Sequence, residues 1–242
     1  MKLAVVLLLC SADGTLLCQQ GQTPSRPEFE VASIKSTLVN QNQPISLSEL
    51  GIFVTPTSVD MKNVTLRTII ARAFGVTTLQ IVGPETIMSE TLYVKAKIPA
   101  GATRSQIPDM IQNLLRDRFG LESHKEPRSV KGGEVSIENP EALRKQLAKE
   151  SSGPPPKEIE HPVRLTIPLS SLAEPLSGLL GMPVVLMGIP ENDDKYIFWL
   201  ETADGPSSIA KSLKQYGIRL TFGKVDVKYI IVDKINKVPT EN

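Results

Sequence analysis

The alternation of hydrophobic and polar residues follows an order that occurs twice along the chain. In the first half, residues 29–34 alternate strictly, which is typical of a half-buried strand. A second extended stretch at residues 52–61 is interrupted by Pro56. Residues 37–50 lie between these two stretches, are polar and have no clear period, so they predict a loop.

Two segments of the first half have apolar residues at helical spacing. The first helix begins at Asn63 or Thr65, either of which can cap a helix, and ends at Gly75. The second helix begins at Thr103 or Ser105. The predicted apolar stripes are Leu66, Ile69, Ile70, Ala73 and Phe74 in the first helix and Ile107, Met110, Ile111, Leu114 and Leu115 in the second.

Shorter extended segments complete the first half. Residues 79–82 and 91–98 predict strands, and residues 121–124 and 134–137 predict a closing strand pair. Because these strand patterns alternate, we expect a mainly antiparallel sheet with the helices on one face and water on the other.

The second half repeats this order. A helix that ends at Tyr216, Gly217 and Ile218 corresponds to the helix of the first half that ends at Phe119, Gly120 and Leu121. The predicted elements are a strand at 163–169, a helix at 170–180, strands at 184–187 and 196–201, a helix at 206–216, and strands at 218–222 and 227–235. Pro206 suits the first turn of its helix, whereas Pro175 is expected to bend or split the earlier one.

The two halves are separated by a segment of different composition. It contains a short charged helix at 140–149 and a proline run at 154–156, which favours an extended conformation. We therefore predict an α+β protein of two tandem small domains, each with two helices packed on a mainly antiparallel sheet, preceded by a signal peptide. The predicted divisions are 1–24 for the signal peptide and flexible lead, 25–138 for the first domain, 139–162 for the charged helix and proline-rich linker, and 163–242 for the second domain.

The first residues have the character of a secretory signal. Met1 and Lys2 precede an apolar run at 3–10 that is too short to span a bilayer, and cleavage after Ala12 or at a later position fits the sequence. Leucines precede both cysteines, Cys10 and Cys18, whereas a lipid-attachment cysteine normally follows a small residue. We expect an extracytoplasmic protein, periplasmic or secreted, with no lipid anchor and no transmembrane segment in the mature chain.

The composition excludes several classes of partner and cofactor. There are 27 lysines and arginines against 26 aspartates and glutamates, spread along the chain, so no strong field attracts nucleic acid or anionic lipid. Both cysteines lie in the leader, so the mature chain has neither disulfides nor thiolate-bound metal. The stability of the mature domains must then come from apolar packing.

Candidate catalytic and metal-binding groups are few. Ser208 and Lys211 have the Ser-x-x-Lys spacing of serine acyl enzymes with a lysine base, but the other two motifs of those enzymes are absent. His124 and His161 are the only histidines, whereas a zinc site needs three or four ligands. We predict no catalytic residue, no metal site and no cofactor.

Three further features have a structural and a functional interpretation. Residues 191–194 carry oxygen donors but lack the spacing and the glycine of a calcium loop, so a solvated hairpin turn is favoured. Asn63 begins a glycosylation acceptor motif, but a helix cap is the preferred interpretation. Trp199 shares a strand with Tyr196 and Phe198 and points away from Phe198, which makes it the first candidate for a binding surface.

A set of longer motifs resembles a known family. These motifs are residues 29–35, 63–67 with Ala71 and Phe74, 80–84, 114–121, 124–126 and the C-terminal ending from 231. They resemble the uncharacterised soil-associated secreted protein family, a bacterial domain of unknown function. The chain departs from that family at Ser36, Thr86 and Leu186 and is shorter near 130–134. The resemblance implies export, no established activity and a sensory or binding role, and it assigns no functional residues.

Three functions stay open from the sequence. The first is a non-enzymatic exported module that binds an envelope protein or a peptide, by strand addition at an exposed sheet edge. The second is a small-ligand receptor or an enzyme with a site in the cleft between the domains. The third is a structural spacer. An unprotected edge strand would favour the first function, and a deep cleft with polar groups from both halves would favour the second.

Overall fold

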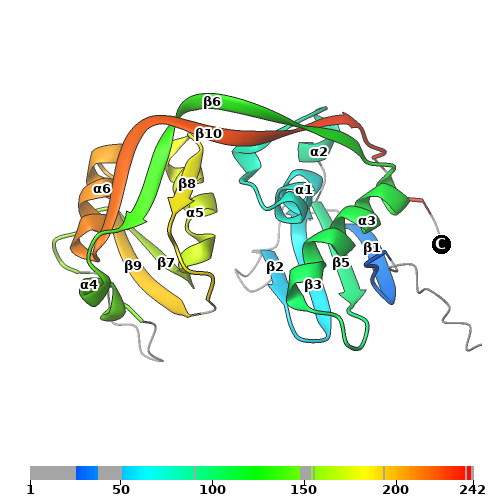
Figure 1. The fold of residues 1–242 in the computed structure, drawn as a ribbon, viewed down its shortest axis with the longest axis horizontal. Helices are drawn as coiled ribbons and strands as arrows, with labels where there is room; N and C mark the ends of the chain where they lie inside the picture. The colour runs from blue at the N-terminus through cyan, green and yellow to red at the C-terminus, as the bar shows by residue number, and fades with distance from the viewer. Residues whose placement is uncertain are drawn as a thin grey trace, which may run out of the picture.

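The computed structural model describes residues 26–37, 51–89, 91–147, 154, 156–192, 194–237 and 239–240. This part of the chain forms six α-helices in two lobes, joined by two long strands that arch from one lobe to the other (Figure 1). None of these helices is long and apolar enough to cross a membrane. The predicted signal peptide lies outside the described residues, as does nearly all of the loop predicted at 37–50.

The first lobe has a four-stranded sheet with its helices packed on one face. The sheet is antiparallel throughout, in the order β1-β5-β3-β2. Its strands are β1 (Val31–Thr37), β2 (Gly51–Val54), β3 (Ser58–Thr65) and β5 (Thr91–Lys97), and its helices are α1 (Leu66–Phe74), α2 (Thr86–Ser89) and α3 (Ile107–Phe119). The predicted apolar stripes of α1 and α3 enter one core with β3 and β5, as the helical spacing predicted, except for Met110, which is buried beside the hollow at β1.

Local capping sets the limits of these helices. Thr65 is the N-cap of α1, and its hydroxyl accepts a hydrogen bond from the N–H of Thr68 at 3.3 Å. Gly75 and Gly120 end α1 and α3 in the left-handed conformation, with φ of 64° and 59°. Of the two caps predicted for α1, the structure uses Thr65, while Asn63 takes a φ of 49° where β3 shifts its register against β5.

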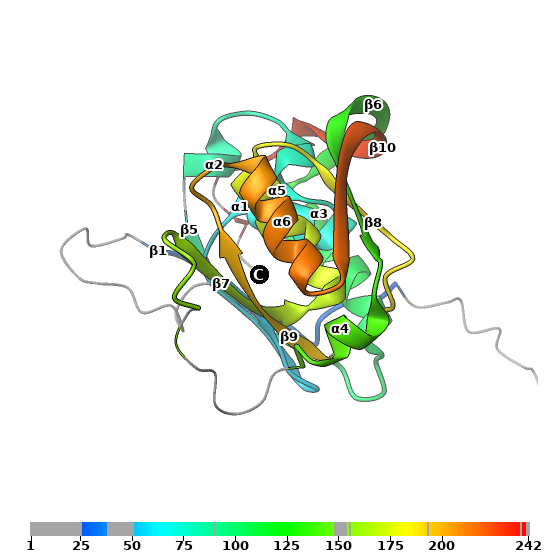
Figure 2. The ribbon, with the colours of Figure 1, turned by 90° about the vertical axis from the view of Figure 1, so that its left-hand side faces the viewer.

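The second lobe is smaller and has a two-stranded antiparallel sheet, β7 with β9. Figure 2 looks onto this lobe, with α5 and α6 packed beside the two strands. Its elements are α4 (Pro140–Arg144), β7 (Pro162–Pro168), α5 (Ala173–Leu180), β8 (Val184–Met187), β9 (Lys195–Glu201) and α6 (Pro206–Gln215). Pro175 lies in the first turn of α5, after a separate 3-10 turn, so the predicted helix is split before the proline.

Two long strands, β6 (Glu122–Ile137) and β10 (Ile218–Lys234), join the lobes. They pair antiparallel from Ile218 opposite Ile137 to Lys234 opposite Glu122. The prediction of two short strands in each half was therefore wrong, because each pair is one continuous strand. We call this pair of strands, β6 and β10, the ribbon. Its alternation of apolar and polar residues is lost where it crosses between the cores, although the backbone pairing continues there.

The ribbon contributes to both cores. Ile230 and Val232 of β10 lie in the first core, and Val135 of β6 lies in the second. Each core therefore contains residues from both sides of the predicted linker at 139–162. The two-residue strand β4 (Ile81–Val82) pairs parallel with β10, and β8 pairs parallel with β6.

The segment between β8 and β9 differs from its prediction. Because β8 pairs with β6 and β9 pairs with β7, this segment connects two different sheets. The predicted hairpin turn at 191–194 is therefore wrong. Strand alternation indicated two strands there, but it carried no information on which neighbour each strand would take.

Candidate functional site

The predicted Ser-x-x-Lys pair lies in α6 without the contact that its chemistry needs. Ser208 is buried, and its hydroxyl donates to the carbonyl of Gly205 at 3.0 Å. Within the described part of the chain, no hydrogen bond joins Ser208 to the exposed Lys211. A nucleophilic serine needs a base within hydrogen-bond reach, and here the hydroxyl donates to a backbone carbonyl at the start of its own helix.

The two histidines are in different lobes. Nδ1 of His124 lies 2.9 Å from Oδ2 of Asp233, and Nδ1 of His161 lies 4.0 Å from Oε1 of Glu201. Both histidines are exposed. Among the residues that the structure describes, no three histidine, aspartate or glutamate side chains come together as a metal site would require.

Trp199 lies on the face of β9 opposite the core and is half-buried. The core side chain next to it, Phe198, is fully buried, and the guanidinium carbon of Arg164 lies 5.7 Å from the centre of the indole ring. The backbone N–H of Trp199 donates to the Tyr216 hydroxyl at 3.2 Å, and that hydroxyl donates to the Trp199 carbonyl at 3.1 Å. The outer edge of β9 is therefore closed at Trp199, and a binding role for its ring stays a prediction.

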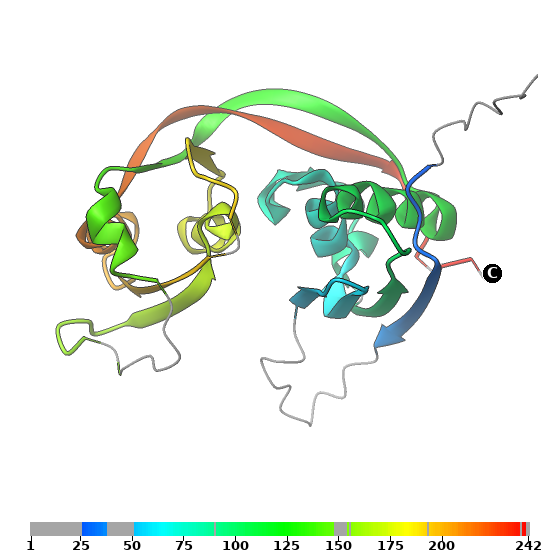
Figure 3. The same cartoon turned by 60° about the horizontal axis from the view of Figure 1, so that its bottom comes forward.

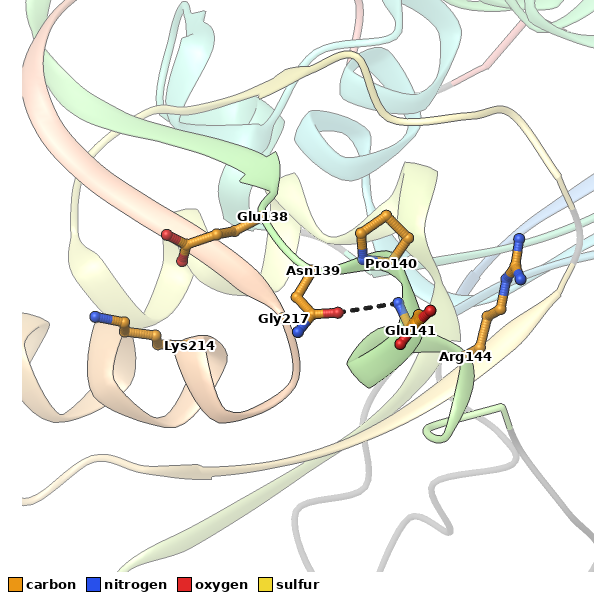
Figure 4. Close-up of a pocket in the computed structure, with 7 residues that line it drawn as sticks. All are labelled: Glu138, Asn139, Pro140, Glu141, Arg144, Lys214 and Gly217. Atoms are coloured by element: carbon orange, nitrogen blue, oxygen red, sulfur yellow. Dashed lines mark hydrogen bonds between the residues drawn. The ribbon is translucent and has the colours of Figure 1, made fainter.

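A hollow of about 750 Å³ at the end of β6 is lined by polar residues, of which Glu138 and Asn139 have side-chain partners (Figure 4). An ion pair with Arg219 lowers the pKa of the Glu138 carboxyl. Asn139 accepts hydrogen bonds from the N–H groups of Glu141 and Ala142, both at 3.1 Å, and so caps α4. These groups stabilise the junction of β6 with α4.

A second hollow of about 520 Å³ lies between the two lobes. The end of α1 and the turn after it form one wall, and the start of α5 and strand β8 form the other. Glu174 joins the walls, because its two carboxylate oxygens accept from the N–H of Thr78 at 2.9 Å and from its hydroxyl at 2.7 Å. The Gln80 side chain donates to the carbonyl of Lys228 in β10 at 3.0 Å, which attaches the first wall to the ribbon.

Strand β1 forms the edge of the first sheet on the side away from the second lobe (Figure 3, blue). At the end of β5, the N–H of Ile98 donates to the carbonyl of Thr57, on the β3 side, at 2.9 Å. The carbonyl of Lys97 accepts from the N–H of Glu30, on the β1 side, also at 2.9 Å. Successive residues of β5 therefore direct their backbone groups alternately toward β3 and β1. Its odd-numbered residues face β1 and pair with the odd-numbered residues there. The outward backbone groups belong to Ala32, Ile34 and Ser36, and none of them has a backbone partner among the described residues.

The other seven-residue edge strand, β7, is bounded by prolines. Alternate N–H groups of β9 donate to groups on the side away from β7, such as that of Ile197 to the carbonyl of Gln146 at 2.8 Å. Arg164 and Thr166 of β7 lie opposite such residues of β9, so their own backbone groups point outward from the sheet. In the same register, Pro162 and Pro168 remove the outward N–H at both ends. Only two outward donors are left on β7, against three on β1.

Side chains on both sides of the β1 edge fit an added strand. The solvent face carries Lys35 and Lys95, which have no ion-pair partner in the described part of the chain, and Lys97, which pairs with Glu30 at 2.8 Å. The core side opens into a hollow of about 170 Å³ between β1 and α3, lined in part by Leu114. Sequence analysis selected Trp199 and did not identify this edge, because alternation at 29–34 predicts a strand without predicting its place in the sheet.

These observations define a mixed α+β protein with two cores, an edge strand β1 whose outward backbone groups have no backbone partner among the described residues, and a cleft between its lobes. The chain belongs to the family described as "Protein of unknown function (DUF3738)", whose model matches residues 67–235. Searches among curated proteins and among solved structures found no match. The family description assigns no activity, so the proposals below are argued from the molecule itself.

Proposed function

We propose that this protein is a non-enzymatic module, exported from the cytoplasm, that binds an extended peptide segment of a partner protein by strand addition at β1. The open edge of β1 is the observation on which this proposal depends. Export is supported by the leader at 1–24, where a positive start precedes a short apolar run.

The two edges of the β7–β9 sheet are protected, whereas the outer edge of β1 is not, and this difference favours β1 as the site of strand addition. Side chains and a carbonyl close the outer edge of β9, and prolines shorten the usable edge of β7. Natural proteins protect edge strands in these ways because an open edge pairs with other chains. An edge without either protection, on the same molecule, is suited to a controlled pairing with a partner.

The chemistry around β1 indicates what the partner strand carries. An added strand would place alternate side chains on the two faces of the sheet. On the solvent face they would lie beside Lys35 of β1, with Lys95 of β5 one strand further away, which favours acidic residues. On the other face they would lie over the hollow between β1 and α3, where apolar residues would contact Ala32 and Leu114, while charged residues such as Asp117 and Arg118 line the rest of the hollow. The expected ligand is an extended segment in which acidic and apolar residues alternate.

A titration with two short peptides tests this proposal. The ¹⁵N-labelled chain from Arg26 would be mixed with a peptide of alternating valine and glutamate, and separately with one of alternating valine and lysine. We expect saturable amide shifts at Ala32, Ile34 and Ser36 with the acidic peptide only. The Lys35→Glu variant should bind it about threefold to tenfold more weakly, because Lys35 lies on β1 itself and like charges would then face each other across β1 and the added strand.

A proline substitution separates β1 from the other edge. Ala32→Pro removes an outward N–H that the fold does not use, so it should weaken binding while unfolding stays normal. Thr166→Pro makes the same change on β7 and serves as the matched control. Equal binding of both peptides, the absence of shifts along β1, or equal losses in the two proline variants would contradict the proposal. If Ala32→Pro fails to fold, the Lys35→Glu variant tests the proposal instead, and unchanged binding of the acidic peptide by that variant would contradict it.

A further inference from the structure

We infer that the cleft between the lobes binds a small monocarboxylate with an apolar body, held through its carboxylate by Arg72. This site is separate from the β1 edge and goes beyond the proposed peptide binding. Its volume, about 520 Å³, falls within the range of roughly 300–1,000 Å³ that is usual for small-molecule sites.

The apolar part of the cleft comes from both lobes. Val184, Val185 and Leu186 of β8 line the second-lobe wall, and Ala71 and Val76 line the first-lobe wall. Val185 and Leu186 are only partly buried, so apolar surface is available to a ligand. Burial of such surface contributes about 25 cal/mol per Å², which makes an apolar body the favoured part of the ligand.

Arg72 is the positive group of the cleft that has no partner. Its side chain makes no hydrogen bond or ion pair with any residue in the described ranges. Arg72 is an exposed residue, but partial desolvation of its guanidinium lowers its pKa, and the positive charge of Arg104 lowers it further. An anion would offset both effects, and the planar guanidinium fork matches a carboxylate with two parallel hydrogen bonds.

The remaining polar groups limit the charge of the ligand. Glu174 lies on the opposite wall, where its carboxylate accepts both hydrogen bonds from Thr78. A second negative charge on the ligand would be repelled by Glu174, so a monocarboxylate is favoured over a phosphate dianion. Ser170 and Ser171 add hydroxyl donors near the start of α5.

The test uses 4-phenylbutyrate as the probe and 4-phenylbutanamide as its uncharged counterpart. Methyl resonances of Ala71, Val185 and Leu186 in the ¹³C-labelled chain report the cleft. We expect 4-phenylbutyrate to shift them saturably, and the amide to shift them at least about tenfold more weakly. Arg72→Gln should weaken 4-phenylbutyrate binding by a similar factor, because a hydrogen bond to a charged group contributes about tenfold or more.

Arg144→Gln is the matched control, because it removes the same charge from an exposed position on α4, in the second lobe. It should leave 4-phenylbutyrate binding unchanged. The inference is overturned if 4-phenylbutyrate causes no shift in the cleft, if the amide binds equally well, or if Arg72→Gln has no larger effect than Arg144→Gln. None of these outcomes depends on peptide binding at β1, so the two proposals can fail separately.

Discussion

We expect alanine at position 217 to destabilise the second lobe strongly. Gly217 connects α6 to β10 with a φ of +81°, and a Cβ at this position would lie 2.1 Å from the carbonyl oxygen of Asn139. The carbonyl of Gly217 accepts hydrogen bonds from the N–H groups of Glu138 and Asn139 at 2.8 and 2.9 Å. This turn therefore fixes the end of β6 against the start of β10.

The size of the effect follows from three costs. Alanine in a left-handed conformation costs about 1–2 kcal/mol. Asn139 must move away from the new methyl group, which weakens two hydrogen bonds of about 1 kcal/mol each and disturbs packing by about 1–3 kcal/mol. We expect Gly217→Ala to lower the free energy of unfolding by about 3–5 kcal/mol, and Tm by about 6–20 °C for a chain of this length.

Urea unfolding followed by tryptophan fluorescence measures this loss. Trp199 is the only tryptophan and reports on the second lobe. Gly181→Ala is the control in the same lobe, because Gly181 also has a positive φ, 63°, but a Cβ there would meet no atom within 4 Å. We expect about 1 kcal/mol for the control. Equal losses in the two variants would refute the close approach of Gly217 to Asn139.

Two further predictions concern the coupling of the lobes and the effect of pH. Leu115→Ala in the first core should lower the free energy of unfolding by about 2–5 kcal/mol. Because β10 enters both cores, this change should also shift the unfolding curve that Trp199 reports from the second lobe. An unshifted Trp199 transition would mean that the lobes unfold separately. Hydrogen bonds from backbone N–H groups, that of Ala203 above all, lower the pKa of the Glu201 carboxyl. The ionised carboxylate therefore stabilises the fold fully at pH values above its ordinary pKa of about 4.5. This stabilisation is lost as the pH falls through the lower pKa of the folded state. The urea midpoint of Glu201→Gln should therefore fall less steeply below about pH 4.5 than that of the unaltered chain, and parallel curves would contradict this.

The sequence allowed the helices to be predicted because their signals are local. The apolar stripe of α1, its Thr65 cap and its Gly75 end lie within one short segment, and the structure confirms all three. The same holds for Pro206, which occupies the first turn of α6. Each of these features depends on neighbours along the chain.

The pairing of β6 with β10 could not be predicted in this way. The residues that pair are far apart in the chain, such as Glu134 with Thr221, and alternation does not identify a partner strand. The ribbon also leaves the cores between its ends, so Lys131 and Lys224 pair where no apolar pattern marks a strand. The sequence therefore indicated short strands at both ends and a gap between them.

The two proposed sites were hidden for a related reason. Whether Ala32 and Ile34 have open backbone groups depends on which strand is left at the edge of the sheet. Whether Arg72 lies opposite Glu174 depends on how the two lobes meet. Trp199 was visible because a large aromatic residue is conspicuous in a sequence, whereas an open edge and an unpartnered arginine become visible only in three dimensions.

The shared ribbon determines how these sites must be studied. A chain cut at the predicted linker would lose Ile230 and Val232 from the first core, and the separate second half would lose Val135. The β1 edge belongs to a sheet that packs on the first core, so its geometry depends on residues from the far end of the sequence. The cleft needs both walls, which Glu174 and Thr78 join directly. Both proposed sites therefore need the whole chain. If a fragment fails to bind, the first explanation is that its core is incomplete, and the failure is no evidence against the site.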